Sequence, residues 1–372
     1  MNAPDPADFD DRGLLQELGR DDEADFREEY QDAFSDISAE RIRNDLKNTV
    51  VQNAREMVES AQALVGGFHP RRAATGQNSE YQFEFMSPLC GIGEDGGDVL
   101  LARTDYHSLH LCIVACEIGG ETRQDWIQRI NGVGELLREQ DYRSLLTNQL
   151  NCPDRTIATI QYVTLAREID LVEFEYSRIG HLVEVDHYAV WERNRENQEF
   201  VHRGGDIAHQ DLVHSLNDGF EYGRIGAPSI QYLVGSHPIL SLEEVVFTLI
   251  ADHRTLDDDN PQEFTREEFR ERFESPLEIG PQGDEYDSVI SSEVDRILEF
   301  GKEIGLLEGD PDEIDSDCDY DIKFSGEKPT KAKEEVVEKY LSFETPYERG
   351  RRAFEQAESR FEAEYSSLDD FT

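Results

Sequence analysis

The run of ten residues from Leu109 to Ile118 is almost wholly apolar, and it sets the strongest constraint on how this chain folds. A strand that is apolar on both faces must be covered on both faces, whereas a strand with one wet face alternates in polarity. Gly119 and Gly120 end the run, and its length suits a strand better than a helix. We therefore expect a central strand in a sheet that carries helices on both sides.

With this run included, the segments before residue 195 predict a helix, three strands, a helix, a strand, a second crossover helix and a last strand. Apolar residues recur at helical spacing over residues 42–64, and polarity alternates over residues 81–85. The other elements that we expect before residue 195 are a strand from residue 99, a helix over 122–140, a strand over 157–165, a helix over 168–178 and a strand over 183–192. This order predicts an α/β (α+β) fold with a mixed central sheet flanked by helices.

The last third of the chain has a different pattern. Capping boxes at Ser241 to Glu244 and at Thr265 to Glu268 predict two short helices, and apolar spacing over 294–304 predicts a third. A strand over 320–324 with a turn after it completes a mostly helical, winged-helix-like domain. A further capping box, Thr345 to Glu348 with Pro346 at the first helical position, predicts a separate C-terminal helix.

These patterns divide the chain into five parts. The middle part contains a short helix over 207–217 and a strand over 230–234. In order, we expect an acidic flexible lead-in (1–35), the α/β core (36–195), a connector (196–238), the winged-helix-like domain (239–342), and a C-terminal helix with its tail (343–372).

The charge balance constrains the solvent in which the chain folds. The sequence has 82 acidic and 36 basic residues, a net charge of −46, and only seven of the basic residues are lysine. Such an excess repels itself at low salt, but the Debye length falls to about 3 Å in molar salt. The composition resembles that of proteins from salt-accumulating archaea. An acidic disordered chain is the alternative, which 37 % hydrophobic residues and clear periodicity disfavour.

Other features of the sequence exclude several classes of protein. The N-terminus is acidic and lacks an apolar core segment, so it does not read as a signal peptide, and no run of 18 apolar residues predicts a membrane span. We therefore expect a cytoplasmic location and no membrane partner. The five cysteines form no CxxC pair, and neither a phosphate-binding GxxxxGK[ST] loop nor a GxSxG nucleophile motif occurs. The histidines at 107, 110, 202, 209 and 214 have no metal-ligand spacing.

Two acidic residues border the central hairpin. Asp98 precedes one strand, and Glu117 lies near the end of the next. Because the start of one antiparallel strand lies beside the end of its partner, the two carboxylates can converge on a hard cation such as Mg²⁺ or Mn²⁺. Such a metal would support phosphodiester hydrolysis. The structural alternative is that Asp98 caps a turn and that Glu117 faces solvent.

With these residues, the segment of about 40–195 resembles the PD-(D/E)xK, or restriction-endonuclease-like, superfamily. The resemblance rests on the element order, on Asp98 after two glycines, and on an acidic residue ending the third strand. It implies a metal-dependent nuclease acting on DNA. The candidate metal ligands are Asp98, Glu117 and Glu121. The residues that could assist them are Gln128 (or Gln124) in the following helix and Glu56 or Glu59 in the first helix.

One departure from the family leaves the function open. If Glu117 matches the family's acidic residue, the position of the family's lysine holds Gly119. If Ala115 matches the acidic residue instead, the lysine position holds Glu117. No lysine lies between Lys47 and Lys302 that could replace it. Arginine cannot act as a base in its place. The alternatives are therefore a metal-dependent nuclease of defence or mobile-element type, an inactive nuclease-like fold serving as a DNA-binding regulator, homodimer platform or scaffold, and a virus- or plasmid-encoded structural protein.

Six of the seven lysines lie within residues 302–339. Lysines in so lysine-poor a chain suggest contacts with phosphate. The predicted recognition helix is acidic, however, so a winged helix that docks to a protein or has a structural role is the alternative. The residues that we predict to contact DNA are Lys323, Lys328, Lys331, Lys333 and Arg296.

Overall fold

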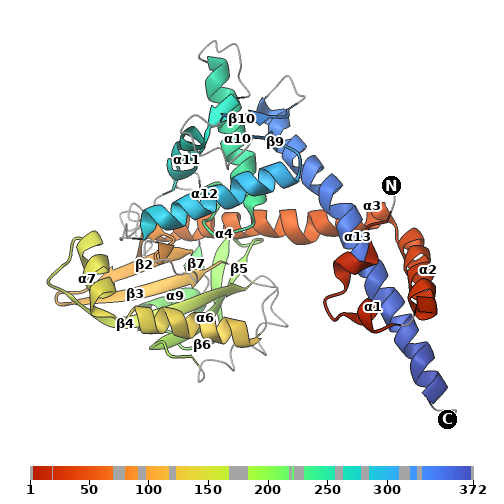
Figure 1. Ribbon diagram of the computed structural model, residues 1–372. Helices are drawn as coiled ribbons and strands as arrows, with labels where there is room; N and C mark the ends of the chain where they lie inside the picture. The colour runs from red at the N-terminus through yellow and green to blue at the C-terminus, as the bar shows by residue number, and fades with distance from the viewer. Residues whose placement is uncertain are drawn as a thin grey trace. The chain divides into compact units, whose positions relative to one another are not determined.

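The chain forms two compact units, each built from segments distant in sequence. One unit comprises Met1–Asn53, Val246–Phe264 and Leu298–Thr372, and the other comprises Ala54–Val245 and Thr265–Ile297. The computed structural model (Figure 1) describes residues 3–18, 20–69, 80–90, 98–116, 123–166, 183–217, 220–221, 230–255, 263–277, 285–309, 319–324 and 329–369.

The second unit contains a seven-stranded mixed sheet whose strands lie in chain order. The first three strands form an antiparallel meander, β4 and β5 continue it in parallel with β3, and the last two strands are antiparallel again. The strands are β1 (Gln82–Met86), β2 (Val99–Thr104), β3 (Ser108–Ala115), β4 (Thr156–Ala166), β5 (His187–Asn194), β6 (Glu199–Gly205) and β7 (Phe220–Glu221).

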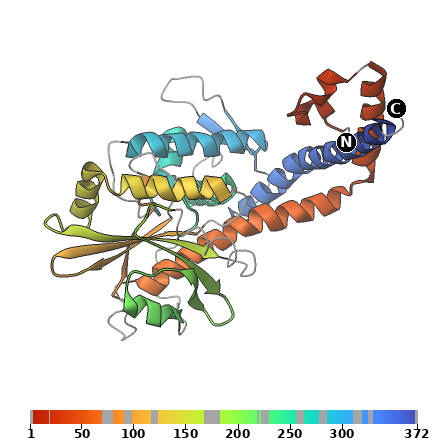
Figure 2. The same ribbon diagram turned by 90° about the horizontal axis from the view of Figure 1, so that it is seen from below.

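Helices cover both faces of this sheet (Figure 2). On one face α6 (Arg123–Leu136) and α7 (Gln140–Gln149) bury apolar residues against alternate positions of β2, β3 and β4. On the other face lie α4 (Gln52–Phe68) and α9 (Gln210–Asn217), and Phe68 of α4 stacks on Trp191 of β5. The predicted central strand β3 is buried from Leu109 to Ala115, so the prediction of a mixed α/β fold is confirmed.

Two predictions for the middle of the chain are wrong. The sheet does not end at residue 195, because β6 and β7 extend it through the segment expected to be a connector. Residues 230–233 form no strand; instead, Tyr232 is buried and its ring stacks on Phe273 of α11 (Arg266–Glu274). The helix predicted over 168–178 lies outside the described residues.

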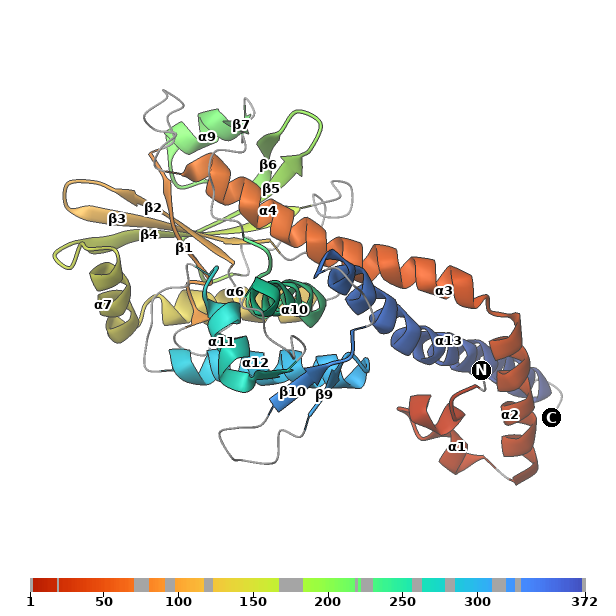
Figure 3. The same ribbon diagram turned by 90° about the horizontal axis from the view of Figure 1, so that it is seen from above.

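In the first unit, the N-terminal helices pack on the long C-terminal helix α13 (Pro329–Asp369; Figure 3). The packed elements are η1 (Pro6–Phe9), α2 (Arg20–Asp36) and α3 (Ala39–Leu46), with α1 (Leu14–Glu17) between the first two. Phe26, Tyr30 and Phe34 of α2 are buried in a common core with Phe354. The prediction of a flexible lead-in over 1–35 is therefore wrong, because aromatic residues four positions apart give this acidic helix an apolar side.

The helix α13 also begins earlier than the sequence pattern predicts. Thr345, expected to cap a new helix, lies inside α13, where its hydroxyl donates to the carbonyl of Leu341 one turn before it. A threonine that bonds to the carbonyl four residues back satisfies its hydroxyl within the helix and no longer serves as a cap. Residues 329–369 are thus one helix with Pro346 in its interior.

Between the sheet and α13 the chain order is helix, strand, helix, helix, strand, strand. The elements are α10 (Pro238–Thr255), β8 (Glu263–Thr265), α11, α12 (Tyr286–Glu303), β9 (Leu307–Glu308) and β10 (Asp319–Ile322). The three strands form a small sheet with β10 between β8 and β9. The capping box that begins α11 is present, with Thr265 and Glu268 bonding to each other's backbone N–H groups.

Two glycines of α6 provide a test of its packing. A Cβ on Gly134 would lie 2.6 Å from the carbonyl oxygen of Glu184, whereas a Cβ on Gly132 would meet nothing within 4 Å. We expect Gly134→Ala to lower the free energy of unfolding by about 1–3 kcal/mol through overpacking. Gly132→Ala should raise it by about 1 kcal/mol through helix propensity. Denaturant titration of both variants checks this, and shifts of equal sign would contradict the packing described.

Candidate functional site

The candidate site lies where β3, β4 and β5 end and β2 begins. Asp98, just before β2, is held on both sides: its backbone N–H donates to the carbonyl of Val114 at 3.0 Å, and its carbonyl accepts the N–H of Ser87 at 2.9 Å. Its carboxylate Oδ2 accepts the backbone N–H of Cys116 at 2.5 Å. In α/β sheets, the carboxyl ends of parallel strands are the usual place for ligands.

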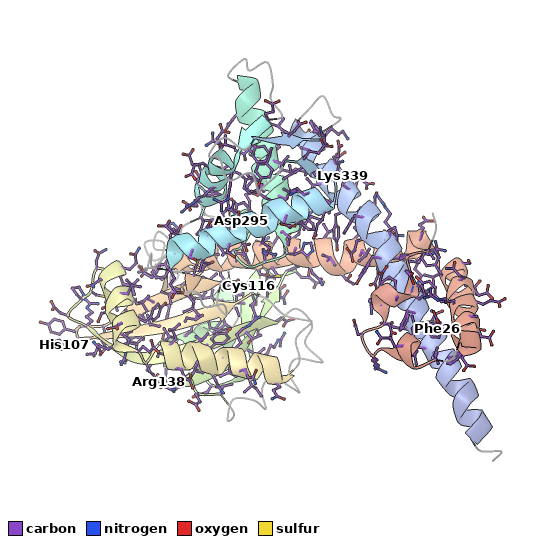
Figure 4. The ribbon with its side chains drawn as sticks, in the orientation of Figure 1. Phe26, His107, Cys116, Arg138, Asp295 and Lys339 are labelled. Atoms are coloured by element: carbon purple, nitrogen blue, oxygen red, sulfur yellow. The ribbon has the colours of Figure 1, made fainter. Side chains whose placement is uncertain are left out.

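The position of Asp98 agrees with the prediction that it lies beside the end of the third strand. Cys116, labelled in Figure 4, follows β3 and immediately precedes Glu117. Glu117 and Glu121 themselves lie outside the described residues, so their convergence with Asp98 stays a prediction. Gln128 is on α6 with an exposed side chain, and the structure gives it no role at the site.

Glu56 and Glu59 of α4, the two residues that could assist the site, form ion pairs with arginines of β5 and of the turn after it. Arg193 lies 3.1 Å from Oε2 of Glu59, and Arg195 lies 3.2 Å from Oε1 of Glu56. Arg193 also donates to the hydroxyl of Ser60 at 3.1 Å. These carboxylates are therefore engaged in ion pairs, and the sequence pattern did not identify the arginines that pair with them.

Asp98 and Arg193 both influence the pKa of the buried Cys116 thiol. Burial raises the pKa of Cys116 well above its ordinary value, the Asp98 carboxylate raises it further, and the Arg193 guanidinium opposes both. Cys116 is thus a protonated, buried thiol and not a nucleophile. Asp98 and Arg193 thus act on the same thiol in opposite directions.

At the opposite end of β3, near the exposed His107 in Figure 4, histidines form a second polar cluster. His110 donates from Nε2 to Asp105 at 3.1 Å, and its Nδ1 lies 2.8 Å from the hydroxyl of Thr159. Arg103 donates to Nδ1 of His209 at 3.1 Å, and the two imidazole rings meet edge to face. This network joins the β2–β3 hairpin to the residue preceding α9, so His110 and His209 have a structural role here.

The described lysines and the arginine predicted to contact DNA have partners within the chain. Lys323 lies 2.8 Å from Glu308 and 2.5 Å from Asp321, and hydrogen bonds to these carboxylates raise its pKa. Lys331 pairs with Glu334, and Lys333 lies over the ring of Phe247. Lys328 lies outside the described residues. Arg296 donates to Glu293 and, at 2.6 Å, to the carbonyl of Ser236.

Part of the lysine cluster lies on a different element from the one predicted. Lys331 and Lys333 are on the first turns of α13, not on a wing, because this helix begins at Pro329. Lys323, Lys333 and Arg296 therefore each join separate parts of the chain.

Comparison of the chain with protein-family models, with curated proteins and with solved structures finds no match. Among the described residues, no three His, Cys, Asp or Glu side chains are grouped so that they could hold a metal ion. No helix in the described ranges combines the length and apolar character needed to cross a bilayer.

Proposed function

We propose that this protein is a divalent-metal-dependent nuclease that acts on DNA, with a restriction-endonuclease-like core. The proposal is supported by the order α4, β1-β2-β3 meander, α6, and β4 parallel to β3, which is the order that the family resemblance implies. The observation that carries it is the Asp98 carboxylate, fixed at the carboxyl edge of the sheet against the backbone immediately before Glu117.

The donor chemistry fits a hard cation. One carboxylate oxygen of Asp98 accepts a backbone N–H, an arrangement that orients a carboxylate ligand. Asp98 and Glu117, with Glu121 near them in sequence, would hold Mg²⁺ or Mn²⁺, ions that prefer carboxylate oxygens. The ion would lower the pKa of a water molecule and stabilise charge on the scissile phosphate.

The segment from α10 to β10 supports a DNA-directed role. Its order of three helices and three strands, with the last strand in the middle of the small sheet, is that of a winged helix. We propose that this winged-helix-like segment positions the nuclease core on its substrate. Because Arg296 and Lys323, two of the residues predicted to contact DNA, are paired with carboxylates, its contribution is to orientation more than to electrostatic attraction.

The test is cleavage of supercoiled and linear DNA in molar KCl with Mg²⁺ or Mn²⁺, compared with EDTA. We expect metal-dependent cleavage that is absent in EDTA. Equal DNA integrity under all these conditions would contradict a nuclease.

One observation favours a second candidate, a catalytically inactive core that binds DNA as a regulator. The family's lysine position holds Gly119, and the described acidic residue of the site already caps a strand through Cys116. Salt-tolerant DNA binding without cleavage under any divalent metal would support this candidate and exclude the first.

A further inference from the structure

Two arginines at the end of β5 share a single carboxylate oxygen. Oε2 of Glu59 lies 3.1 Å from Nη2 of Arg193 and 3.6 Å from Nη2 of Arg195. The arginines are two residues apart, at the end of the strand and in the turn that follows, and the glutamate comes from α4. An oxyanion held between two guanidinium groups is a typical arrangement for recognising phosphate.

The inner arginine is held in place independently of this glutamate. Arg193 has only 12 % of its side chain exposed, and it also donates to the hydroxyl of Ser60 and to the carbonyl of Glu56. Arg195 and Glu59 are half exposed, at 47 % and 49 %. Glu59 can therefore rotate into solvent without uncovering the core, whereas Arg193 stays fixed.

The charges at this position favour exchange for a phosphate group. Glu56 and Glu59 balance Arg193 and Arg195, so withdrawal of Glu59 leaves one net positive charge at the carboxyl edge of the sheet. A phosphodiester has two non-bridging oxygens and a full negative charge, which matches two guanidinium groups. In molar salt, counterion release contributes little to affinity, so direct contacts of this kind matter most.

We propose that Arg193 and Arg195 bind a backbone phosphate of the nucleic acid, and that Glu59 occupies this phosphate position when the site is empty. The inference rests on the proposed function for the identity of the ligand. Beyond the proposed function, the inference assigns two phosphate-contacting residues that the family resemblance does not identify. It also assigns Glu59 as a carboxylate of the chain that competes with the substrate. Arg193 lies near the end of β5, which runs parallel to β3 through β4, and Asp98 lies beside the end of β3. The phosphate position is therefore at the same carboxyl edge of the sheet as the candidate metal ligand.

The experiment measures binding of a fluorescent DNA oligonucleotide by anisotropy in molar KCl with EDTA, where no cleavage occurs. We expect Glu59→Gln to tighten binding about three- to tenfold, since the competitor loses its charge, and Arg195→Gln to weaken it about tenfold through loss of a charged hydrogen bond. Glu184→Gln and Arg138→Gln break a comparably exposed pair, 3.3 Å apart, in the segment before β5 and the turn after α6, and serve as matched controls.

The outcomes separate this inference from the proposed nuclease. If Glu59→Gln and Arg195→Gln bind DNA like their controls while the wild-type protein still cleaves DNA, the phosphate site is wrong and the nuclease stands. If both variants shift affinity as expected but no metal supports cleavage, the phosphate site stands and the nuclease is wrong. Circular dichroism of each variant confirms that the fold is retained, which the exposure of Glu59 and Arg195 favours.

Discussion

Replacing Asp98 with asparagine should abolish metal-dependent DNA cleavage while leaving the fold intact. The amide oxygen of the new side chain can still accept the N–H of Cys116, so the end of β3 stays capped, but the charge that attracts the metal is gone. The loss should exceed the roughly 10- to 100-fold cost of removing an outer-shell partner of a metal ligand. Cleavage rates in molar KCl with Mg²⁺, together with thermal unfolding, provide the measurement.

Two further variants make this result specific. Asp98→Ala removes both the charge and the cap, so it should lose activity and also about 1–3 kcal/mol of stability. Asp186→Asn removes the charge from another carboxylate that accepts a backbone N–H, that of Ile160 at 2.8 Å, and should cleave DNA like the wild type. Full activity in Asp98→Asn would show that Asp98 is only a structural cap.

Transfer from molar KCl to dilute salt should destabilise the protein strongly. With a net charge of −46, the folded chain depends on screening, and the Debye length grows from about 3 Å at 1 M to about 10 Å at 0.1 M salt. We expect the melting temperature to fall by more than about 10 °C, which corresponds to about 3–5 kcal/mol for units of this size.

Calorimetry or circular dichroism across a KCl series checks this dependence. Restoration of the folded state on returning the salt would show that the effect is an equilibrium one. A melting temperature that is equal at both salt concentrations would contradict the view that this composition is an adaptation to high salt.

The sequence predicts those parts of the fold that depend on local pattern. The apolar run of β3 requires burial on both faces, and this correctly indicates a sheet between two layers of helices. The antiparallel pairing expected between the strand from residue 99 and this run places Asp98 beside the end of β3, where the structure has it. Element order could be read because each segment has a clear period of helix or strand.

The features that the sequence does not predict depend on contacts between segments that are distant in the chain. Acidic residues dominate α2, so the apolar side formed by Phe26 and Tyr30 is recognisable only once α13 covers it. The partners Arg193 and Glu59 are 134 residues apart, and no local pattern indicates that they meet. The alternating arginines at the end of a predicted strand were a visible signal, but their significance depends on α4 crossing that face of the sheet.

Binding of Mn²⁺ in molar KCl, followed by the loss of the free-ion electron paramagnetic resonance signal, tests the central claim most directly. High potassium suppresses non-specific binding by the many surface carboxylates. The proposed nuclease predicts a saturable Mn²⁺ site in the wild type and in Asp186→Asn that is lost in Asp98→Asn. Mn²⁺ binding that is unsaturable in the wild type, or equal in all three proteins, would contradict a metal centre at this edge of the sheet.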